Sequence, residues 1–363
     1  MTDGSYGAGG ADPLARRTAT PGASTRAVRR AAARLRGWGG VAAMAVACGL
    51  TASLTLLPLA HGGGAAAVPG TPVSGPGVGT GIQVKADTCR DPEASLRPST
   101  ADGPTLRAIR KRGKLIVGVD QSSYLWGYRN PETQALQGFD IDLAKAIAKD
   151  ILGDEDAVIL RAVPTNQRVA ALDNGKVDLV VRTMTVNCRR IQQVAFSTAY
   201  FETGQQVLAH KLDRSITGHD ASLRGKRVCT AESSTAYEAL EENAFGAVFK
   251  DPGDGTKDDE DLLTVPNQLD CLARLQLGEV DAVVTDSALA AGQAAQDPAV
   301  ELKGTRFTKE YYAVAARLGN DDLVRRVNKV LEGYRKGPWQ KAYQKWLEAV
   351  LPGMTAPPAP LYK

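Results

Sequence analysis

The sequence has few of the residues that most enzyme and metal sites require. Its 363 residues include three histidines and five cysteines, and no two cysteines have CxxC spacing, so no zinc site is expected. No nucleophile elbow, HExxH motif or P-loop occurs, and the glycine run at 75–81 neither follows a strand nor opens a helix. These absences argue against the common hydrolase, metalloprotease and nucleotide-binding classes, and we expect no cofactor and no metal.

Most of the chain also has no marked excess of positive over negative side chains, or the reverse. The formal net charge is +4, but residues 1–60 alone hold seven arginines and two aspartates. The other 303 residues hold 37 basic and 38 acidic side chains. The basic excess therefore belongs to the N-terminal segment, and no nucleic-acid-binding surface is indicated. With 43% hydrophobic and 23% charged residues, the rest is typical of a folded soluble body.

The N-terminal segment has the pattern of a membrane anchor. Residues 1–36 are basic, and the 24 residues at 37–60 are uncharged, long enough to cross a hydrocarbon core of about 30 Å. The arginines keep the front end in the cytoplasm, so the body is delivered outside. The stretch ending at Cys48 resembles a lipobox, which would make Cys48 a lipidation site, and cleavage at Ala65–Ala67 is a third possibility. Residues 61–87 read as a flexible linker.

The body alternates short apolar runs with helical patterns, and does so twice. Strands are predicted at 114–119, 158–160, 177–181, 226–231 and 280–286. Helices are predicted at 138–151, around 165–173, after a cap at Asn187, at Ser233–Leu240, at Gln268–Leu277 and within 321–347. Asp140 or Asp142 is expected to cap or charge the first turn of the helix at 138–151. Two similar halves predict an α/β fold with two lobes and a cleft between them.

The four cysteines of the body predict disulfide bonds. An exported body lies in an oxidising compartment, where disulfides form and persist, and four cysteines allow three pairings. Pairing within each half is the most economical choice, so we expect Cys89–Cys188 and Cys229–Cys271. Four buried thiols are the alternative.

Six segments in this order resemble the polar amino-acid-binding proteins of bacterial ABC importers, solute-binding family 3. They are KLIVGVD, GFDIDLAKAIA, GKVDLVVRTMTVNCRRIQQVAFSTAY, LRGKRVCT, VDAVVTD and GYRKGPWQKAYQKWL. The resemblance covers roughly residues 104–350. It implies an α/β, two-lobed periplasmic-binding-protein (type II) fold with two chain crossovers, behind the N-terminal anchor and linker. Lobe I would comprise 104–202 and 310–350, lobe II would comprise 203–309, and 351–363 would be a tail.

The resemblance also assigns the residues that would hold a free amino acid. Arg190 would grip the α-carboxylate, for which a planar guanidinium is suited, and Asp286 would bind the α-ammonium. Thr183 and Thr185 match small hydroxyl positions of the family. We add Ser234 and Thr235 as ligand residues from their place in the chain, with simple capping of a helix as the alternative. The last two begin a predicted helix, whose free N–H groups can bind a carboxylate.

Three further positions bear on which amino acid is bound. Arg168 matches an arginine of relatives that bind acidic amino acids, and Arg182 replaces a small residue usual in relatives that bind basic ones. Two extra cations would repel lysine and arginine and attract a side-chain carboxylate, although Arg168 could lie on a solvated helix face and Arg182 could pair with another residue of its lobe. We expect one aromatic wall, from Tyr124, with Trp126 and Tyr128 as alternatives.

The sequence therefore predicts a monomeric extracytoplasmic binding protein for an acidic or amide L-amino acid, with glutamate or aspartate first. Its ligand would be delivered to the membrane subunits of an ABC importer. A sensor that reports to a membrane signalling protein or a kinase pathway is the alternative, since it would use the same lobe closure. Some relatives of the fold are cyclohexadienyl-type dehydratases, for which Glu232 is the one candidate acid. We expect no enzymatic activity.

Overall fold

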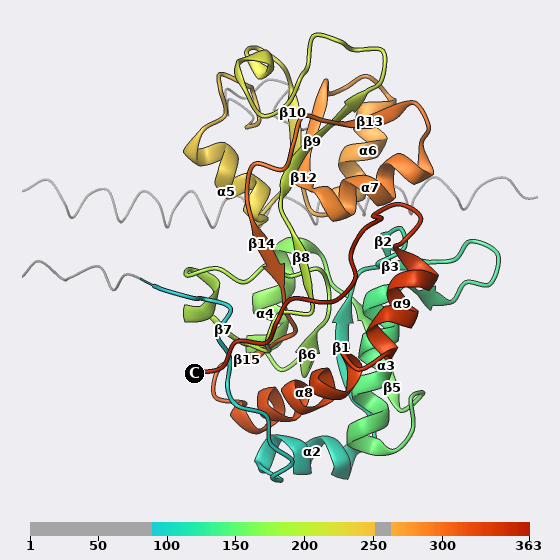
Figure 1. Cartoon of the computed structure of the whole chain (residues 1–363), viewed down its shortest axis with the longest axis vertical. Helices are drawn as coiled ribbons and strands as arrows, with labels where there is room; N and C mark the ends of the chain where they lie inside the picture. Colours follow the sequence, from blue (N-terminus) through green and yellow to red (C-terminus); the bar gives the residue numbers. More distant parts are fainter. Residues whose placement is uncertain (1–88, 251–262) are drawn as a thin grey trace, which may run out of the picture. The chain divides into compact units, whose positions relative to one another are not determined.

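Two five-stranded sheets, each covered by helices, form the part of the chain that the computed structural model describes, residues 89–250 and 263–363 (Figure 1). The predicted anchor at 37–60, Cys48 and the linker lie outside these residues. Within them, no helix has the length and apolar character needed to cross a bilayer. The α/β class is as the sequence predicts, because short apolar strands alternate with amphipathic helices in both halves.

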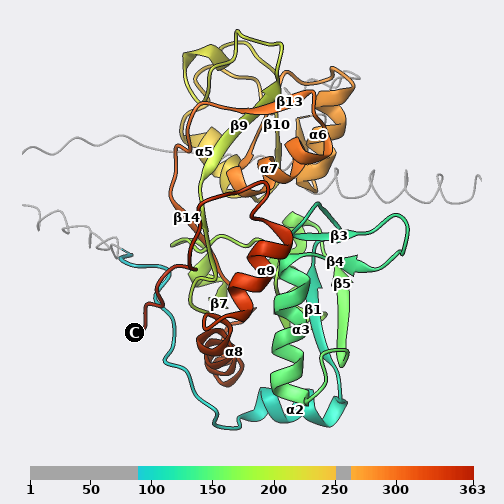
Figure 2. The same cartoon turned by 45° about the vertical axis from the view of Figure 1, so that its right-hand side comes forward.

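The first sheet has the strand order β5-β1-β6-β15-β7. β1 runs parallel to β5 and β6, whereas β15 is antiparallel to both of its neighbours. The bounds of the strands are β1 Leu115–Val119, β5 Val158–Ala162, β6 Leu179–Val180, β7 Val194–Phe196 and β15 Ala315–Arg317. The helices beside it are α2 Pro104–Arg112, α3 Phe139–Leu152, α4 Arg168–Asp173, α8 Asp321–Tyr334 and α9 Pro338–Trp346. We name this sheet and these helices lobe I; Figure 2 shows α3, α8 and α9 gathered on it.

The second sheet has the order β11-β10-β12-β9-β13, with β9 antiparallel to β12 and β13. Its strands are β9 Gln205–His210, β10 Val228–Ala231, β11 Thr264–Val265, β12 Ala282–Asp286 and β13 Val300–Lys303. Its helices are α5 Thr235–Glu242, α6 Gln268–Gln276 and α7 Ser287–Gln296. We name this sheet and these helices lobe II. Both sheets place the carboxyl ends of their parallel strands where loops can carry ligand-binding side chains.

The chain passes from one lobe to the other along two paired strands. β8, Phe201–Thr203, lies directly before β9, and β14, Glu310–Tyr312, follows β13. They pair antiparallel, with Glu310 opposite Thr203. A small sheet of β2 Ser122–Ser123, β3 Gly127–Arg129 and β4 Leu136–Gln137 follows β1. Any closing motion of the lobes must therefore bend the two-stranded ladder of β8 and β14.

Both disulfides have the pairing that the sequence predicts. Cys229 and Cys271 are fully buried in the core of lobe II, where they join β10 to α6. Cys89 and Cys188 join the first described residue to the loop after β6. The second bridge ends two residues before Arg190, so it fixes the segment that carries this side chain.

Three local expectations can now be made more specific. Asp140 and Asp142 both lie in the first turn of α3, as expected, although no side chain caps the helix. Asp140 is buried, and its carboxylate accepts the backbone N–H of Thr183 and the hydroxyl of Tyr200. The helix expected after Asn187 is one 3₁₀ turn, Arg190–Gln192. In the tail at 351–363, Tyr362 forms a β-bridge with Ser95.

Candidate ligand-binding site

The two lobes meet across a cleft through direct hydrogen bonds. The backbone N–H of Thr165 in lobe I donates to the carbonyl of Pro266 in lobe II at 3.0 Å. At the other end of the same face, the side chain of Asn187 donates to Glu238 on α5 at 2.9 Å. The described structure is therefore a closed form, in which residues of both lobes line one site.

A single loop of lobe I carries three of the predicted ligand residues. It follows β6 and begins at Thr183, whose backbone has a left-handed φ of 41° and whose N–H donates to Asp140 at 2.9 Å. This strained conformation costs energy and needs support from its surroundings. The loop ends where Asn187 accepts the N–H of Arg190 at 2.9 Å. The chain thereby brings Thr183, Thr185 and Arg190 together.

Arg190 reaches across the cleft, and no carboxylate of residues 89–250 or 263–363 forms an ion pair with it. Its guanidinium donates to the carbonyl oxygen of Thr185 at 2.8 Å and to that of Ser233, in lobe II, at 3.0 Å. The side chain is 5% exposed. Burial lowers the pKa of Arg190, and the negative charges of Glu238 and Glu310 act against that shift. A buried cation held only by carbonyl oxygens retains donors and charge for an anion.

Arg168 approaches the same carbonyl oxygen from α4. Its guanidinium donates to the carbonyl of Thr165 at 3.0 Å and lies 3.5 Å from that of Ser233. Burial lowers the pKa of Arg168 well below its usual range, and the neighbouring cations Arg190 and Arg182 lower it further. Arg168 is thus not on a solvated helix face. It lines, with Arg190 and Ser233, a cavity of about 300 Å³.

Arg182 has a different environment. It is fully buried, and its guanidinium forms a 2.8 Å ion pair with Asp120 at the end of β1. It also donates to the hydroxyl of Thr165 at 3.0 Å. Pairing within its own lobe was the alternative interpretation of this residue. Its charge is already neutralised by Asp120, so we no longer include it among the cations offered to a ligand.

Lobe II supplies the start of α5 and the end of β12. Ser234 caps α5, with its hydroxyl accepting the N–H of Tyr237 at 3.0 Å. Thr235 donates its hydroxyl to Glu310 at 2.8 Å. Asp286 ends β12, is buried, and accepts the side-chain amide of Gln205 at 2.6 Å. Burial, and then the charge of Glu310, raise the pKa of Asp286 to about 8.

The three aromatic residues after β1 separate into two environments. Trp126 is a core residue, packed edge-on against Phe139 and Phe201, with its indole N–H on the carbonyl of Ala288. Tyr124 and Tyr128 are half-buried and contact each other edge to face. Trp126 is therefore excluded as the ligand-facing ring, and Tyr124 and Tyr128 remain candidates.

The sequence reasoning missed Gln205 and Glu310. Both lie at the lobe crossovers and hydrogen-bond to predicted ligand residues. A charged residue in a strand that must be buried at a crossover is the one signal that could have identified Glu310.

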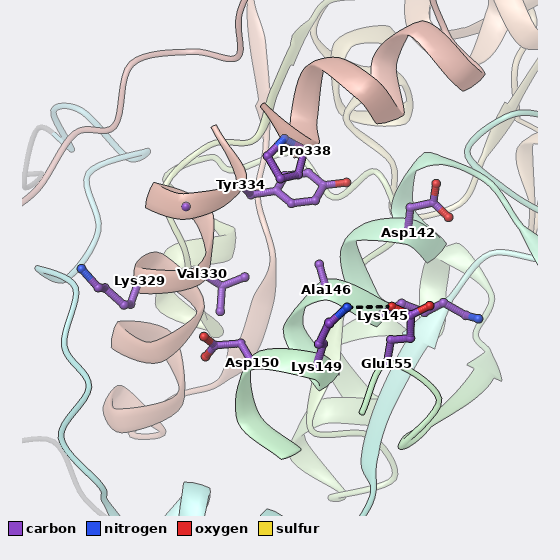
Figure 3. A pocket seen from close by; sticks show the side chains of 11 residues that line it. Asp142, Lys145, Ala146, Lys149, Asp150, Glu155, Lys329, Val330, Tyr334 and Pro338 are labelled. Atoms are coloured by element: carbon purple, nitrogen blue, oxygen red, sulfur yellow. Dashed lines mark hydrogen bonds and ion pairs between the residues drawn. The ribbon is translucent and has the colours of Figure 1, made fainter. Parts of the chain in front are cut away.

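A larger cavity lies elsewhere in lobe I. It has a volume of about 560 Å³ and opens between α3 and α8 of lobe I (Figure 3). Lysines and acidic residues form its rim, and Figure 3 shows Lys145, Lys149 and Glu155 there. None of the predicted ligand residues lines it. Volume alone therefore does not locate the candidate site.

Comparison with known proteins agrees with this architecture. The family model for bacterial extracellular solute-binding proteins, family 3, matches residues 115–349. The ABC transporter glutamine-binding protein of Bacillus subtilis is 34% identical over 67% of this chain and 85% of its own length. The glutamine-binding protein of Geobacillus stearothermophilus is 36% identical over 63% of this chain and 82% of its own.

Solved structures show the same fold. A structure titled an ancestral arginine-binding protein bound to glutamine is 36% identical, with a TM-score of 0.58 over 65% of this chain and 98% of that one. The matched residues include both five-stranded sheets and both crossovers. The chain therefore belongs to the bacterial extracellular solute-binding proteins, family 3, and is a solute-binding protein rather than an enzyme.

Proposed function

We propose that the protein binds a free L-amino acid with an acidic or amide side chain in the cleft between its lobes. One observation carries the proposal: two buried arginines, Arg168 and Arg190, converge on a single carbonyl oxygen. Among the described residues, neither guanidinium has a carboxylate within 4.0 Å. Like charges buried together are costly, and one anionic group between them would relieve both.

The opposite end of the site supports a zwitterionic ligand. Asp286 and Glu310 are buried carboxyl groups on the hinge side of the cleft, and Arg190 is close enough to affect the pKa of Asp286. An α-carboxylate on Arg190 and an α-ammonium at Asp286 would place each charge of an amino acid against its opposite. A second carboxylate or an amide would then face Arg168. Thr183, Thr185, Ser234 and Thr235 would surround the ligand with hydroxyl and N–H groups.

We expect glutamate, aspartate and glutamine to be the tightest ligands. Arg168 favours the two acids, because its cation would pair with their side chains. Glutamine is the ligand named for both relatives and for the bound state of the ancestral protein. Lysine and arginine should not bind, because their positively charged side chains would be repelled by the positive charge of Arg168.

We also propose a location for the protein and a recipient for its ligand. The chain would be held outside the membrane by the segment at 37–60 or by a lipid on Cys48, and two disulfides suit such a compartment. Closure on the ligand would be read by the membrane subunits of an ABC importer, the transporter class named for the Bacillus relative. Energy would come from the importer.

Calorimetry tests the binding proposal directly. The compact unit Val84–Lys363 would be titrated with each of the twenty amino acids. Saturable binding of acidic or amide amino acids, without binding of lysine or arginine, is the expected result. Binding of basic amino acids alone, or of none of the twenty, would overturn it.

A further inference from the structure

Glu310 lies at the point where the two lobes join. It begins β14, which pairs with β8 in the ladder that connects the lobes (Figure 1). Its side chain is 8% exposed. No motif of the sequence marked this residue, and the proposed ligand contacts do not include it.

The carboxylate of Glu310 accepts hydrogen bonds from both lobes at once. One oxygen accepts the hydroxyl of Thr185 in lobe I and that of Thr235 in lobe II, each at 2.8 Å. The other accepts Gln205 and Thr308, each at 3.0 Å. These four donors occupy the acceptor sites of the carboxylate. Glu310 therefore has no capacity left for a ligand, and it contacts one threonine of each lobe at the same time.

The same carboxylate is linked to Asp286. The side-chain amide of Gln205 lies 2.6 Å from Asp286 and 3.0 Å from Glu310, so one NH₂ group bridges two buried acids. The other charged and titratable groups around Asp286 are Tyr312, on β14, and Arg190 and Arg168, from lobe I. Two acids this close resist carrying two negative charges.

We propose that Glu310 is a positioning residue for ligand capture: it fastens one threonine of each lobe in the closed form and couples ligand binding to a proton on Asp286. The proposal rests on the proposed function, because it needs an ammonium group at Asp286. The pKa of about 8 for this carboxyl supports the coupling. An arriving ammonium favours the carboxylate form, so binding below that pH releases the proton that Asp286 carried.

The coupling has a definite sign. At pH 7 the wild type should release about one proton per ligand bound, and its affinity should rise as the pH is raised toward 8. A neutral side chain at position 310 removes one of the two causes of the raised pKa of Asp286. Asp286 is then more often ionised before the ligand arrives, so fewer protons are released.

The test compares Glu310→Gln and Glu310→Asp with Glu202→Gln in the full chain. Glu202 is the matched control, since it lies on the neighbouring strand β8 but forms an ion pair with Lys309, at 3.5 Å, on the surface. Titration of glutamine in phosphate and in Tris buffer gives both the affinity and the number of protons released. Small-angle scattering of each protein without ligand gives the radius of gyration.

We expect Glu310→Gln to bind roughly tenfold more weakly or worse, as for a lost charged hydrogen bond, to release fewer protons and to have a larger radius of gyration. Glu310→Asp should keep the proton release, because it keeps the charge, while losing affinity. Glu202→Gln should match the wild type in all three. Wild-type affinity, proton release and radius in Glu310→Gln would overturn the role of Glu310 while leaving the proposed function intact. If the wild type binds no amino acid, the proposed function fails, and an unchanged radius in Glu310→Gln then overturns the fastening role by itself.

Discussion

Lobe I contains three buried arginines. They lie in two regions that differ in the ion-pair and hydrogen-bond partners of the guanidinium group. Arg182 lies against Asp120 in an ion pair of 2.8 Å and has no exposed surface. Arg168 and Arg190 are 4% and 5% exposed, and within the described part of the chain they donate only to backbone carbonyl oxygens. Burial is thus nearly the same, while the partners differ. The comparison teaches that the partner of a buried cation, rather than its burial, separates a structural arginine from one available to a ligand.

The largest effect should come from breaking the ion pair. Arg182→Met leaves the charge of Asp120 buried without a partner, and such a loss costs about 3–5 kcal/mol of the free energy of unfolding. Urea unfolding measures it. Adding Asp120→Asn to the same protein should recover much of the loss, because the orphaned charge is gone. A fully stable Arg182→Met protein with weakened ligand binding would instead move Arg182 into the binding region.

The second largest effect should be on binding, not on stability. Arg190→Ala removes the cation proposed to hold the α-carboxylate, so every amino acid ligand should lose about 2–5 kcal/mol of binding free energy. Folding should change less than in Arg182→Met, because no carboxylate is left unpaired. Arg189→Ala is the matched control: this neighbour is exposed and lies 3.4 Å from Glu238. Calorimetry measures the affinity of both variants for glutamate. An unchanged affinity in Arg190→Ala would mean that the binding site lies elsewhere.

This difference between the arginines shows which contacts could be predicted from the sequence and which could not. The alternation of apolar runs is local, so the strands and most helices could be predicted from it, and the two halves that it defines led to the pairing of the cysteines. Arg190 could be placed because it lies within one of the six similar segments, and Arg168 because it matches an arginine of relatives that bind acidic amino acids. In contrast, the partners of Arg182 and Glu310 are far away in the sequence. Asp120, which forms the ion pair with Arg182, is 62 positions away, and Thr185, which donates to Glu310, is 125 positions away. No local pattern contains such a contact.

The predictions for two single positions, the aromatic residue that faces the ligand and Asp140, were incomplete for a different reason. The sequence shows three aromatic residues at alternate positions after β1, and nothing local says which ring is buried. Trp126 is buried because its indole N–H reaches Ala288 in the other lobe. Likewise Asp140 has the position of a helix-charging residue, but Thr183 and Tyr200 provide donors that a helix N-terminus would otherwise supply. In both places a hydrogen-bond partner that is distant in the sequence, an acceptor for Trp126 and two donors for Asp140, overrode the local preference.

A third prediction separates the two arginines of the binding region from each other. Arg168→Met should weaken glutamate and aspartate by about 1.5–3 kcal/mol, the value of a charged hydrogen bond, and glutamine and asparagine much less. The methionine retains part of the apolar stem. Arg190→Ala should show no such preference, because all four ligands share the α-carboxylate. Equal losses for acids and amides in Arg168→Met would make Arg168 a structural residue like Arg182.

The smallest effect concerns the acid beside the ion pair. Burial raises the pKa of Asp140 from 3.8 to about 7, with Asp120 adding to the rise and Arg182, Tyr200 and Thr183 opposing it. Between pH 4 and 7 the folded state then binds a proton that the unfolded state has lost, so this group makes the free energy of unfolding fall as the pH rises.

Asp140→Asn should remove that dependence. An asparagine can still accept the N–H of Thr183 and can donate to the oxygen of Tyr200, so the fold is kept. Urea unfolding at pH 5 and pH 8 should show that the variant loses about 1–2 kcal/mol less than the wild type over this range. Asp286 also has a raised pKa, but it is present in both proteins and cancels in the difference. Identical losses would mean that Asp140 is ionised at pH 5, held so by Arg182, and that the ion-paired region extends to Asp140 as a second anion.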